Sequence, residues 1–278
     1  MSEMNDTVRQ LCAIMKDKYS TGISHYDDAF LEKAILYRIT ETQTRSAAEY
    51  LDLLGNSFPE SVLLLNSLSN SFSEFFRNPL TFLVLEQNVL PALFKNKTDK
   101  NIKEIRMWSA GCASGQEPYS LAILTKEFMK THYTDYDVRI FATDKLENEI
   151  KNAGKGIYTE SALNNTRFLF VKKYFTPAGE NYQINKNLRD AVDFSVFDLL
   201  DTDAISPPSS IYGDFDLIIC SNVLFYYKEE IQHLIMSKLY RSLSLGGFLI
   251  TGEAETGIVK TYRGFRQFMV PAAVFVKN

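Results

Sequence analysis

The 278-residue chain is poor in cysteine, and its cysteines are scattered. Cys12, Cys112 and Cys220 lie far apart, and no C-x-x-C pair occurs. Three thiols at such spacing predict neither a zinc site nor a disulfide framework. We therefore expect no metal site and no disulfide-stabilised fold.

Long apolar runs are also missing. No stretch approaches 18 apolar residues, and the start, MSEMNDTVRQ, has no basic region followed by an apolar one. These features predict neither a membrane-spanning helix nor a secretory signal, so a cytoplasmic protein without direct membrane insertion is expected. The formal net charge is only −4, which argues against general electrostatic binding of nucleic acid.

The first hundred residues show helical periodicity and no convincing strand. Apolar residues recur at three- and four-residue spacing in DDAFLEKAILYRI, behind Asp27 or Asp28 as an N-cap, and in SAAEYLDLLG, which should end at Gly55. PESVLLLNSL predicts a helix with Pro59 in its first turn. SFSEFFRNPLTFLVLEQNVLPALF predicts one short and one longer helix with Pro79 between them.

After the polar linker KNKTDKNIKE, short strands alternate with helices. The predicted strands are IRMWSA, VRIFAT, VDFSVF, FDLIICSN and GFLITGE, and the helices between them are EPYSLAILTKEFMK, LENEIKNAGKG and KEEIQHLIMSKLYRSL. Strands of nearly continuous apolar character predict a parallel sheet covered by helices, which is an α/β fold. Residues 172–194, with a turn at PAGEN, predict a small antiparallel β insertion, and the C-terminus predicts a hairpin around Pro271.

The stretch MWSAGCASGQEPYS predicts a strand, a tight glycine loop and a new helix, where such folds hold nucleotide-like ligands. Gly111 and Gly115 lack Cβ atoms, so we expect a ligand to approach the backbone there. The spacing differs from G-x-G-x-x-G, and Glu117 would repel a pyrophosphate at the helix start. A carboxylate there suits a ligand with an ammonium and a sulfonium, such as S-adenosylmethionine. An ordinary strand-to-helix turn containing two glycines is the alternative.

Polar residues also follow the next three predicted strands. Asp144 stands where nucleotide-binding α/β folds present an acid to ribose hydroxyls, and Asp198 could accept from an adenine amino group beside the Leu199 backbone. Helix or strand-end capping is the alternative for both acids. Asn222 ends the fourth strand, with Tyr226 about one turn later. Such signals at four successive strand ends indicate one ligand site at the carboxyl edge of the sheet.

The motifs FSEFFRNP, WSAGCASGQEPYSLAI, FATD with AGKGIY, FDLL and CSNVLFYY resemble, in the same order, those of the CheR family of chemotaxis-receptor glutamate methyltransferases. The resemblance runs from about Ser69 to the C-terminus. It implies an all-helical N-terminal domain, residues 1–68, and a Rossmann-like S-adenosylmethionine-dependent methyltransferase domain, residues 69–278, with the inserted β-subdomain. The product would be S-adenosylhomocysteine.

The resemblance also implies a set of site residues. Tyr226 would stand near the transferring methyl, and Arg77 would pair with the donor carboxylate or draw the acceptor glutamate. Packing of Tyr226 with Phe225 and Tyr227 is the alternative. With Gly111 from the loop, the implied cofactor residues are Ser71, Ser73, Arg77, Glu117, Asp144, Asp198, Leu199, Ser221 and Asn222.

The chain departs from the family pattern at several of these positions. The family commonly has Asn and Thr at positions 71 and 73, Asn at 198, and Arg at 221, where this chain has Ser, Ser, Asp and Ser. The loss of that arginine leaves Arg77 as the main cation for the cofactor carboxylate. The turn TPAGENY is shorter than in members tethered to a receptor tail peptide, which argues against tethering.

The implied partner is the cytoplasmic domain of a methyl-accepting chemotaxis receptor. A glutamate acceptor, with an ordinary pKa of about 4.3, is ionised at neutral pH and needs no general base. This fits motifs without histidine, and we expect His25, His132 and His233 to be surface or packing residues. The competing hypotheses are a non-catalytic cofactor-binding signalling module, a methyltransferase for a non-chemotaxis protein, and a dehydrogenase, which the missing G-x-G-x-x-G disfavours.

Overall fold

The computed structural model describes residues 3–69, 73–132, 135–210 and 213–278. It divides into two compact units, each described by itself. One comprises Met1–Asn70 with Phe225–Gln232, and the other comprises Ser71–Leu224 with His233–Asn278. We call them the helical unit and the sheet unit. The sequence did not indicate that the short segment Phe225–Gln232 packs with the helical unit.

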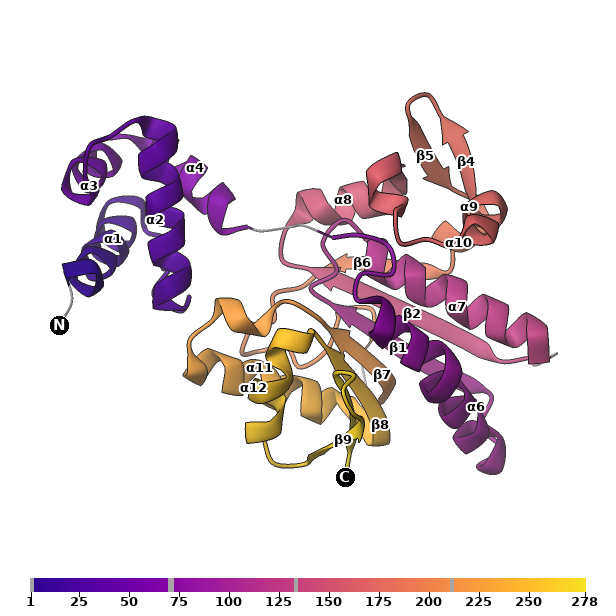
Figure 1. Cartoon of the computed structure of the whole chain (residues 1–278). Helices are drawn as coiled ribbons and strands as arrows, with labels where there is room; N and C mark the ends of the chain where they lie inside the picture. The colour runs from indigo at the N-terminus through magenta and orange to yellow at the C-terminus, as the bar shows by residue number, and fades with distance from the viewer. Residues whose placement is uncertain (1–2, 70–72, 133–134, 211–212) are drawn as a thin grey trace. The chain divides into compact units, whose positions relative to one another are not determined.

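The helical unit is built from four helices, drawn in indigo and violet in Figure 1: α1 (Glu3–Tyr19), α2 (Asp28–Thr42), α3 (Ala47–Asn56) and α4 (Phe58–Leu68). Asp27 caps α2, and its side chain accepts from the Phe30 N–H. The prediction that α3 ends at Gly55 is wrong. The helix continues to Asn56, because Ser57 ends α3 and also caps the first turn of α4.

The segment around Pro79 also differs from the prediction of two helices separated by that proline. Residues 73–78 are not helical, and Pro79 instead opens one continuous helical run: α5 (Pro79–Val84), the π-helical turn η1 (Leu85–Val89) and α6 (Leu90–Asp99). Pro79 suits this first turn, where its missing N–H costs nothing. The π turn lies just before Pro91, where an unbroken α-helix would suffer a clash.

A seven-stranded sheet forms the centre of the sheet unit (Figure 1), in the order β6-β2-β1-β7-β8-β10-β9. The first five strands are parallel, and β10 pairs antiparallel with both β8 and β9. This confirms the predicted parallel sheet and the hairpin at its end. The bounds are β1 (Glu104–Ala110), β2 (Asp137–Asp144), β6 (Val192–Val196), β7 (Phe215–Cys220), β8 (Leu243–Thr251), β9 (Phe265–Met269) and β10 (Val274–Lys277).

Helices cover the sheet and bury its apolar side chains. Alternation along β1 sends Ile105 and Met107 into a core with residues of α6 and α7. The opposite face carries Trp108, whose ring contacts the Phe197 ring. The Lys238 Nζ lies over the Phe197 ring, 4.9 Å from its centroid. Further helices of this unit are α7 (Gln116–His132), α8 (Glu147–Lys155) and α12 (Thr256–Thr261), with the 3-10 turn η4 (Glu253–Glu255). The 3-10 turn η3 (Leu224–Tyr226) and the helix α11 (Glu229–Ser242) belong partly to each unit, because Phe225–Gln232 is counted with the helical unit.

The predicted β insertion is present, but its predicted limits of 172–194 are wrong. A three-stranded antiparallel sheet has the order β3-β5-β4, with β3 (Ile157–Thr159), β4 (Phe175–Ala178) and β5 (Asn181–Ile184). It begins fifteen residues earlier than expected because β3 pairs with β5, and it ends before β6, which belongs to the large sheet. The turn η2 (Glu160–Leu163) and the helices α9 (Phe168–Tyr174) and α10 (Lys186–Arg189) complete it. In the described part of the chain, no helix has the length and apolar character to cross a membrane.

Candidate cofactor site

The four strands whose ends carry the predicted ligand signals are neighbours in the sheet. They follow the order β6-β2-β1-β7 and run parallel, so their carboxyl ends meet at one edge. Asp198 follows β6, Asp144 ends β2, the glycine loop follows β1, and Ser221 and Asn222 follow β7. The order and direction of the strands therefore bring together residues that are up to about a hundred positions apart in sequence.

The glycine loop is held by hydrogen bonds to β2 and by close packing. The N–H groups of Gly111 and Cys112 both donate to the Thr143 carbonyl, at 2.8 and 2.9 Å. A Cβ on Gly111 would lie 2.7 Å from the Val223 side chain, and one on Gly115 would lie 2.9 Å from Ala153. In the direction of each missing Cβ, the space is taken by the chain's own side chains, and approach of a ligand to the loop backbone stays a prediction. Both glycines are needed for their positive φ, +79° and +94°, and for close packing.

Glu117 lies in the first turn of α7, beneath this loop. Its Oε1 accepts from the Ser109 hydroxyl at 2.7 Å, and Ser221 also hydrogen-bonds it. The pKa of this carboxyl is raised to about 7, chiefly by burial and also by the Glu255 charge, while hydrogen bonds from the two serines and the Arg77 charge oppose the shift. The side chain nevertheless keeps partial solvent exposure. The ionised form is therefore incompletely compensated, and a cationic group at this edge would stabilise it.

Arg77 belongs to the short segment before α5. This segment is anchored by the Phe76 N–H, which donates to the Ser120 hydroxyl at 3.0 Å, and by the Phe75 N–H, which donates to the Ala162 carbonyl at 3.1 Å. The sequence motif FSEFFRNP thus folds onto α7 and the β insertion, and the Arg77 charge reaches Glu117. Ser73 lies in the same segment, whereas Ser71 lies outside the described residues.

The acid that ends β2 and the acid that follows β6 both cap turns, and their predicted binding role is compatible with these hydrogen bonds. Asp144 accepts from the Leu146 N–H through Oδ1 and from the Ala113 N–H through Oδ2, at 3.0 and 2.9 Å. Asp198 is exposed and accepts from the Leu200 N–H at 2.9 Å. Each carboxylate oxygen has a second lone pair, so these turns do not use up the acceptors. Leu199 is buried beside Asp198.

Tyr226 has a different placement from the other predicted site residues. It lies in the Phe225–Gln232 segment that packs with the helical unit, and its ring centroid is 4.8 Å from that of Phe30 on α2. Its carbonyl accepts from the Asp27 N–H at 2.8 Å. The ring contacts agree with the packing alternative, and a role beside the methyl group stays a prediction.

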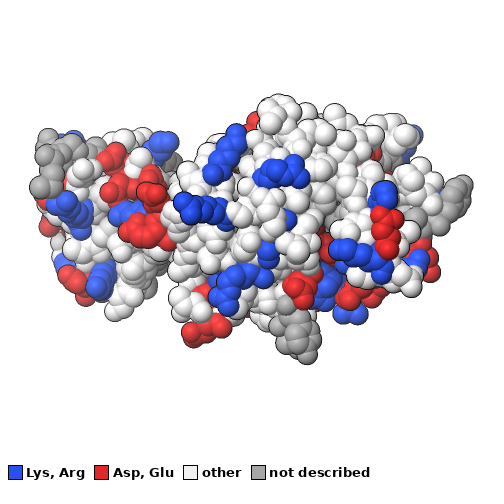
Figure 2. Space-filling model, turned by 90° about the horizontal axis from the view of Figure 1, so that it is seen from below, with Lys and Arg blue, Asp and Glu red and all other residues white. Residues whose placement is uncertain are grey.

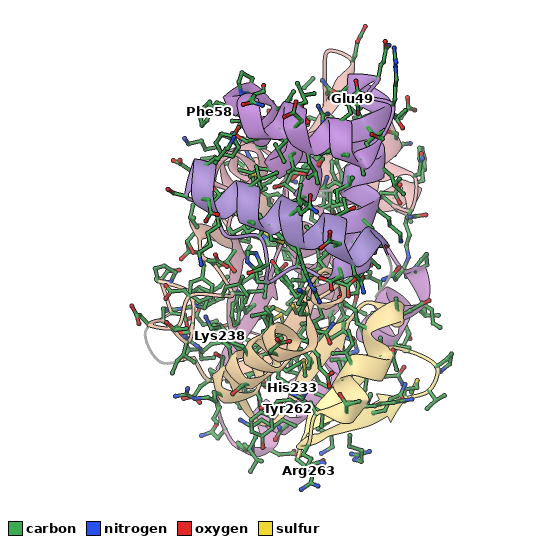
Figure 3. The ribbon with its side chains drawn as sticks, turned by 90° about the vertical axis from the view of Figure 1, so that its left-hand side faces the viewer. Glu49, Phe58, His233, Lys238, Tyr262 and Arg263 are labelled. Atoms are coloured by element: carbon green, nitrogen blue, oxygen red, sulfur yellow. The ribbon has the colours of Figure 1, made fainter. Side chains whose placement is uncertain are left out.

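Three residues of the site were missed by sequence reasoning: Ser109, Ser120 and Glu255. Glu255 had a usable signal, since it follows the predicted strand GFLITGE as the other polar residues follow theirs. The two serines lie within apolar segments and carried none. The histidines of the sheet unit lie against aromatic rings, His132 beside Phe128. His233 lies beside Tyr262 (Figure 3). No group of three or more metal-ligating side chains occurs among the residues described.

Comparison with known proteins identifies the family of this chain. The model of the family described as CheR methyltransferase, SAM binding domain, matches residues 71–272. The chain belongs to the CheR methyltransferase family. Its fold is that of S-adenosylmethionine-dependent methyltransferases, and S-adenosylmethionine is the cofactor. This match confirms the resemblance to the CheR family that the sequence motifs predicted. The roles of the individual site residues remain predictions.

Several curated relatives share most of this chain. The chemotaxis protein methyltransferase of Borreliella burgdorferi is 29% identical over 254 residues, which cover 90% of this chain and 88% of the relative. That of Listeria innocua is 32% identical over 246 residues, 87% of each chain. Chemotaxis protein methyltransferase 1 of Pseudomonas aeruginosa is 33% identical over 199 residues, 69% of each. The similarity to these relatives therefore extends beyond the central motif.

Proposed function

We propose that this methyltransferase esterifies glutamate side chains of methyl-accepting chemotaxis receptors and releases S-adenosylhomocysteine. The observation that supports it most is the match of residues 71–272 to the CheR methyltransferase family, together with relatives that are named chemotaxis protein methyltransferases. The chemistry of the site agrees with a cationic donor, because Glu117 has a raised pKa that such a ligand would lower.

Each residue at the sheet edge would bind a different part of the cofactor. Glu117 would hold the ammonium group, Asp144 the ribose hydroxyls, and Asp198 with the Leu199 backbone the adenine. Arg77 would face the donor carboxylate. Ser221, Asn222, Ser71 and Ser73 would complete the lining of the cofactor site. The free lone pairs of Asp144 and the exposure of Asp198 are compatible with these assignments.

The acceptor needs no base from the protein. A glutamate side chain is ionised at neutral pH, so its oxygen can form a bond to the methyl carbon while the carbon–sulfur bonding pair returns to sulfur. The cofactor supplies an electrophilic methyl group on a cationic sulfur. The protein therefore contributes mainly alignment and exclusion of water, which can lower a barrier by on the order of 7–11 kcal/mol. Tyr226 would orient the acceptor carboxylate, while Arg77 holds the donor carboxylate.

Methyl labelling of receptor-bearing membranes from the protein's own host tests this function. With tritiated donor, we expect label in receptor bands, released by mild alkali as methanol because glutamate methyl esters hydrolyse and N-methyl groups do not. Label on another protein would identify a different substrate. Binding of S-adenosylhomocysteine without label on any protein would support the non-catalytic signalling module. Tyr226→Phe tests the hydroxyl, and unchanged turnover would remove its proposed role.

A further inference from the structure

Glu255 lies beyond the end of β8, in the turn η4, and its buried carboxylate accepts four backbone N–H groups. Its Oε1 accepts from Val223 and Leu224, both at 2.7 Å. Its Oε2 accepts from Asn222 at 2.9 Å and from Gly252 at 2.7 Å. Three of these donors are consecutive residues after β7, so a single side chain fixes the backbone of that loop.

The loop held by Glu255 forms one wall of the cofactor site. Asn222 adopts φ +60°, an unfavourable conformation that hydrogen bonds must maintain. The Val223 side chain fills the space next to Gly111, and Ser221 hydrogen-bonds Glu117. Gly252 is also closely packed, since a Cβ there would lie 3.0 Å from Glu255 Oε2 and 3.2 Å from the Asn222 nitrogen. Glu255 thereby ties the ends of β7 and β8 to the glycine loop after β1.

We propose that Glu255 is the positioning residue of the cofactor site, holding the loop Asn222–Leu224 in its binding geometry and setting the charge environment of Glu117. Glu255 lies outside the sequence motifs that carry the family resemblance. The inference concerns binding of the cofactor and does not depend on which acceptor is methylated.

The effect of the Glu255 charge on the pKa of Glu117 has a definite direction. The charged groups that face Glu117 are Arg77, which lowers its pKa, and Glu255, which raises it. The buried thiols of Cys112 and Cys220 also face it, and their own pKa values lie well above the ordinary range, so they stay neutral. Removing the Glu255 charge should therefore lower the pKa of Glu117 and shift cofactor binding toward lower pH.

Calorimetric binding of S-adenosylhomocysteine from pH 5.5 to 8.5 tests both halves. In Glu255→Gln the amide offers one oxygen in place of two, so affinity should fall at least about tenfold, and the pH midpoint should move down. Glu255→Asp keeps the charge but has a shorter reach, so the midpoint should stay while affinity falls. Glu60→Gln, which disturbs a buried carboxylate of the helical unit, should lower stability and leave affinity and midpoint unchanged.

Wild-type affinity and midpoint in a folded Glu255→Gln variant would overturn the proposal. If that variant does not fold, hydrogen exchange of the wild-type protein without ligand decides the matter. The amides of Asn222, Val223 and Leu224 should be strongly protected, and exchange at the rate of an open loop would refute the clamp. None of these measurements requires methyl transfer, so they separate this proposal from the proposed function.

Discussion

At the scale of single residues, Glu117 makes cofactor binding depend on pH. Its pKa of about 7 in the ligand-free protein means that protonation competes with binding of a cationic ligand. Affinity for S-adenosylhomocysteine should fall about tenfold for each pH unit below 7 and level off above it. Calorimetry in two buffers of different ionisation enthalpy would measure both the affinity and the proton released. Glu117→Gln should bind weakly with a flat profile, and a wild-type profile in that variant would exclude this role.

The same carboxyl affects the stability of the ligand-free protein. Its pKa is raised in the folded chain above the usual 4.5, so the fold binds the proton more tightly than the unfolded chain does. This contribution is fully present below pH 4.5 and is lost as pH rises to about 7. It amounts to about 3 kcal/mol at most. Above pH 7, bound cofactor should restore much of this lost stability, because its cationic group would stabilise the ionised Glu117.

Gly111 provides a second prediction at the residue scale. An alanine there must adopt φ +79° and place its Cβ 2.7 Å from Val223, so Gly111→Ala should lower the free energy of unfolding by about 1–3 kcal/mol. Adding Val223→Ala should recover the part due to the clash. Gly154, in α8, has no atom within 4 Å of an added Cβ, and Gly154→Ala should raise stability by up to about 1 kcal/mol. Denaturant titrations of the variants provide the test, and equal effects at both glycines would contradict it.

At the scale of elements, one buried ion pair joins three helices of the helical unit. Arg38 on α2 makes a bidentate pair with Glu60 on α4, at 2.8 and 2.7 Å, and the Tyr50 hydroxyl of α3 donates to the same carboxylate at 3.0 Å. Arg38→Met would leave a buried charge without its partner and should cost about 3–5 kcal/mol. Arg38→Met with Glu60→Leu should restore most of this loss, because neither charge remains.

Separate signals can locate that effect. Trp108 is the single tryptophan of the chain and lies in the large sheet, so its fluorescence follows the sheet unit. Circular dichroism follows helices in both units. Arg38→Met should shift the helical transition and leave the tryptophan transition in place, while Lys95→Ala, in an exposed pair, should shift neither. A stability unaffected by Arg38→Met would show that the pair is dispensable.

The elements that the sequence predicted well are those with strong local periodicity. All five parallel strands and the helices α7, α8 and α11 were predicted, since their burial pattern is visible in the chain itself, whereas the short helices α9 and α10 were not. Helix α1 was not predicted, although Val8, Leu11 and Met15 have helical spacing and are buried, because these few apolar residues stand in a largely polar segment. The three-residue strand β3 exists only through its pairing with β5, so no local pattern could reveal it.

The candidate site was predictable for a related reason. Parallel strands put their ends at one edge, so polar residues at four strand ends could be grouped from the sequence alone. What the sequence could not show was how the loops pack: that Val223 fills the space beside Gly111, and that Glu255 holds three amides of another loop. These contacts depend on the sheet order, which brings β8 beside β7.

At the scale of the whole molecule, the charge of the helical unit bears on partner recognition. Residues 1–69 hold the six basic side chains Arg9, Lys16, Lys18, Lys33, Arg38 and Arg45 against the ten acids Glu3, Asp6, Asp17, Asp27, Asp28, Glu32, Glu41, Glu49, Asp52 and Glu60. The structure reduces the basic set further, because Arg38 is buried with Glu60. On the face shown in Figure 2, acidic side chains gather on the helical unit, and the basic side chains of the other unit lie mostly apart from one another among uncharged residues.

This balance predicts weak electrostatic steering toward an acidic receptor region. Steered association slows sharply as salt screens the charges, whereas an unsteered encounter does not. If the proposed function holds, kcat/KM for receptor methylation should change by less than about threefold between 50 and 200 mM salt. Replacing Glu49 and Asp52 on α3 by lysine should raise the low-salt rate and introduce a salt dependence, while Lys95→Ala serves as a control outside this unit. A steep decline of the wild-type rate with salt would show that a basic surface elsewhere draws the receptor.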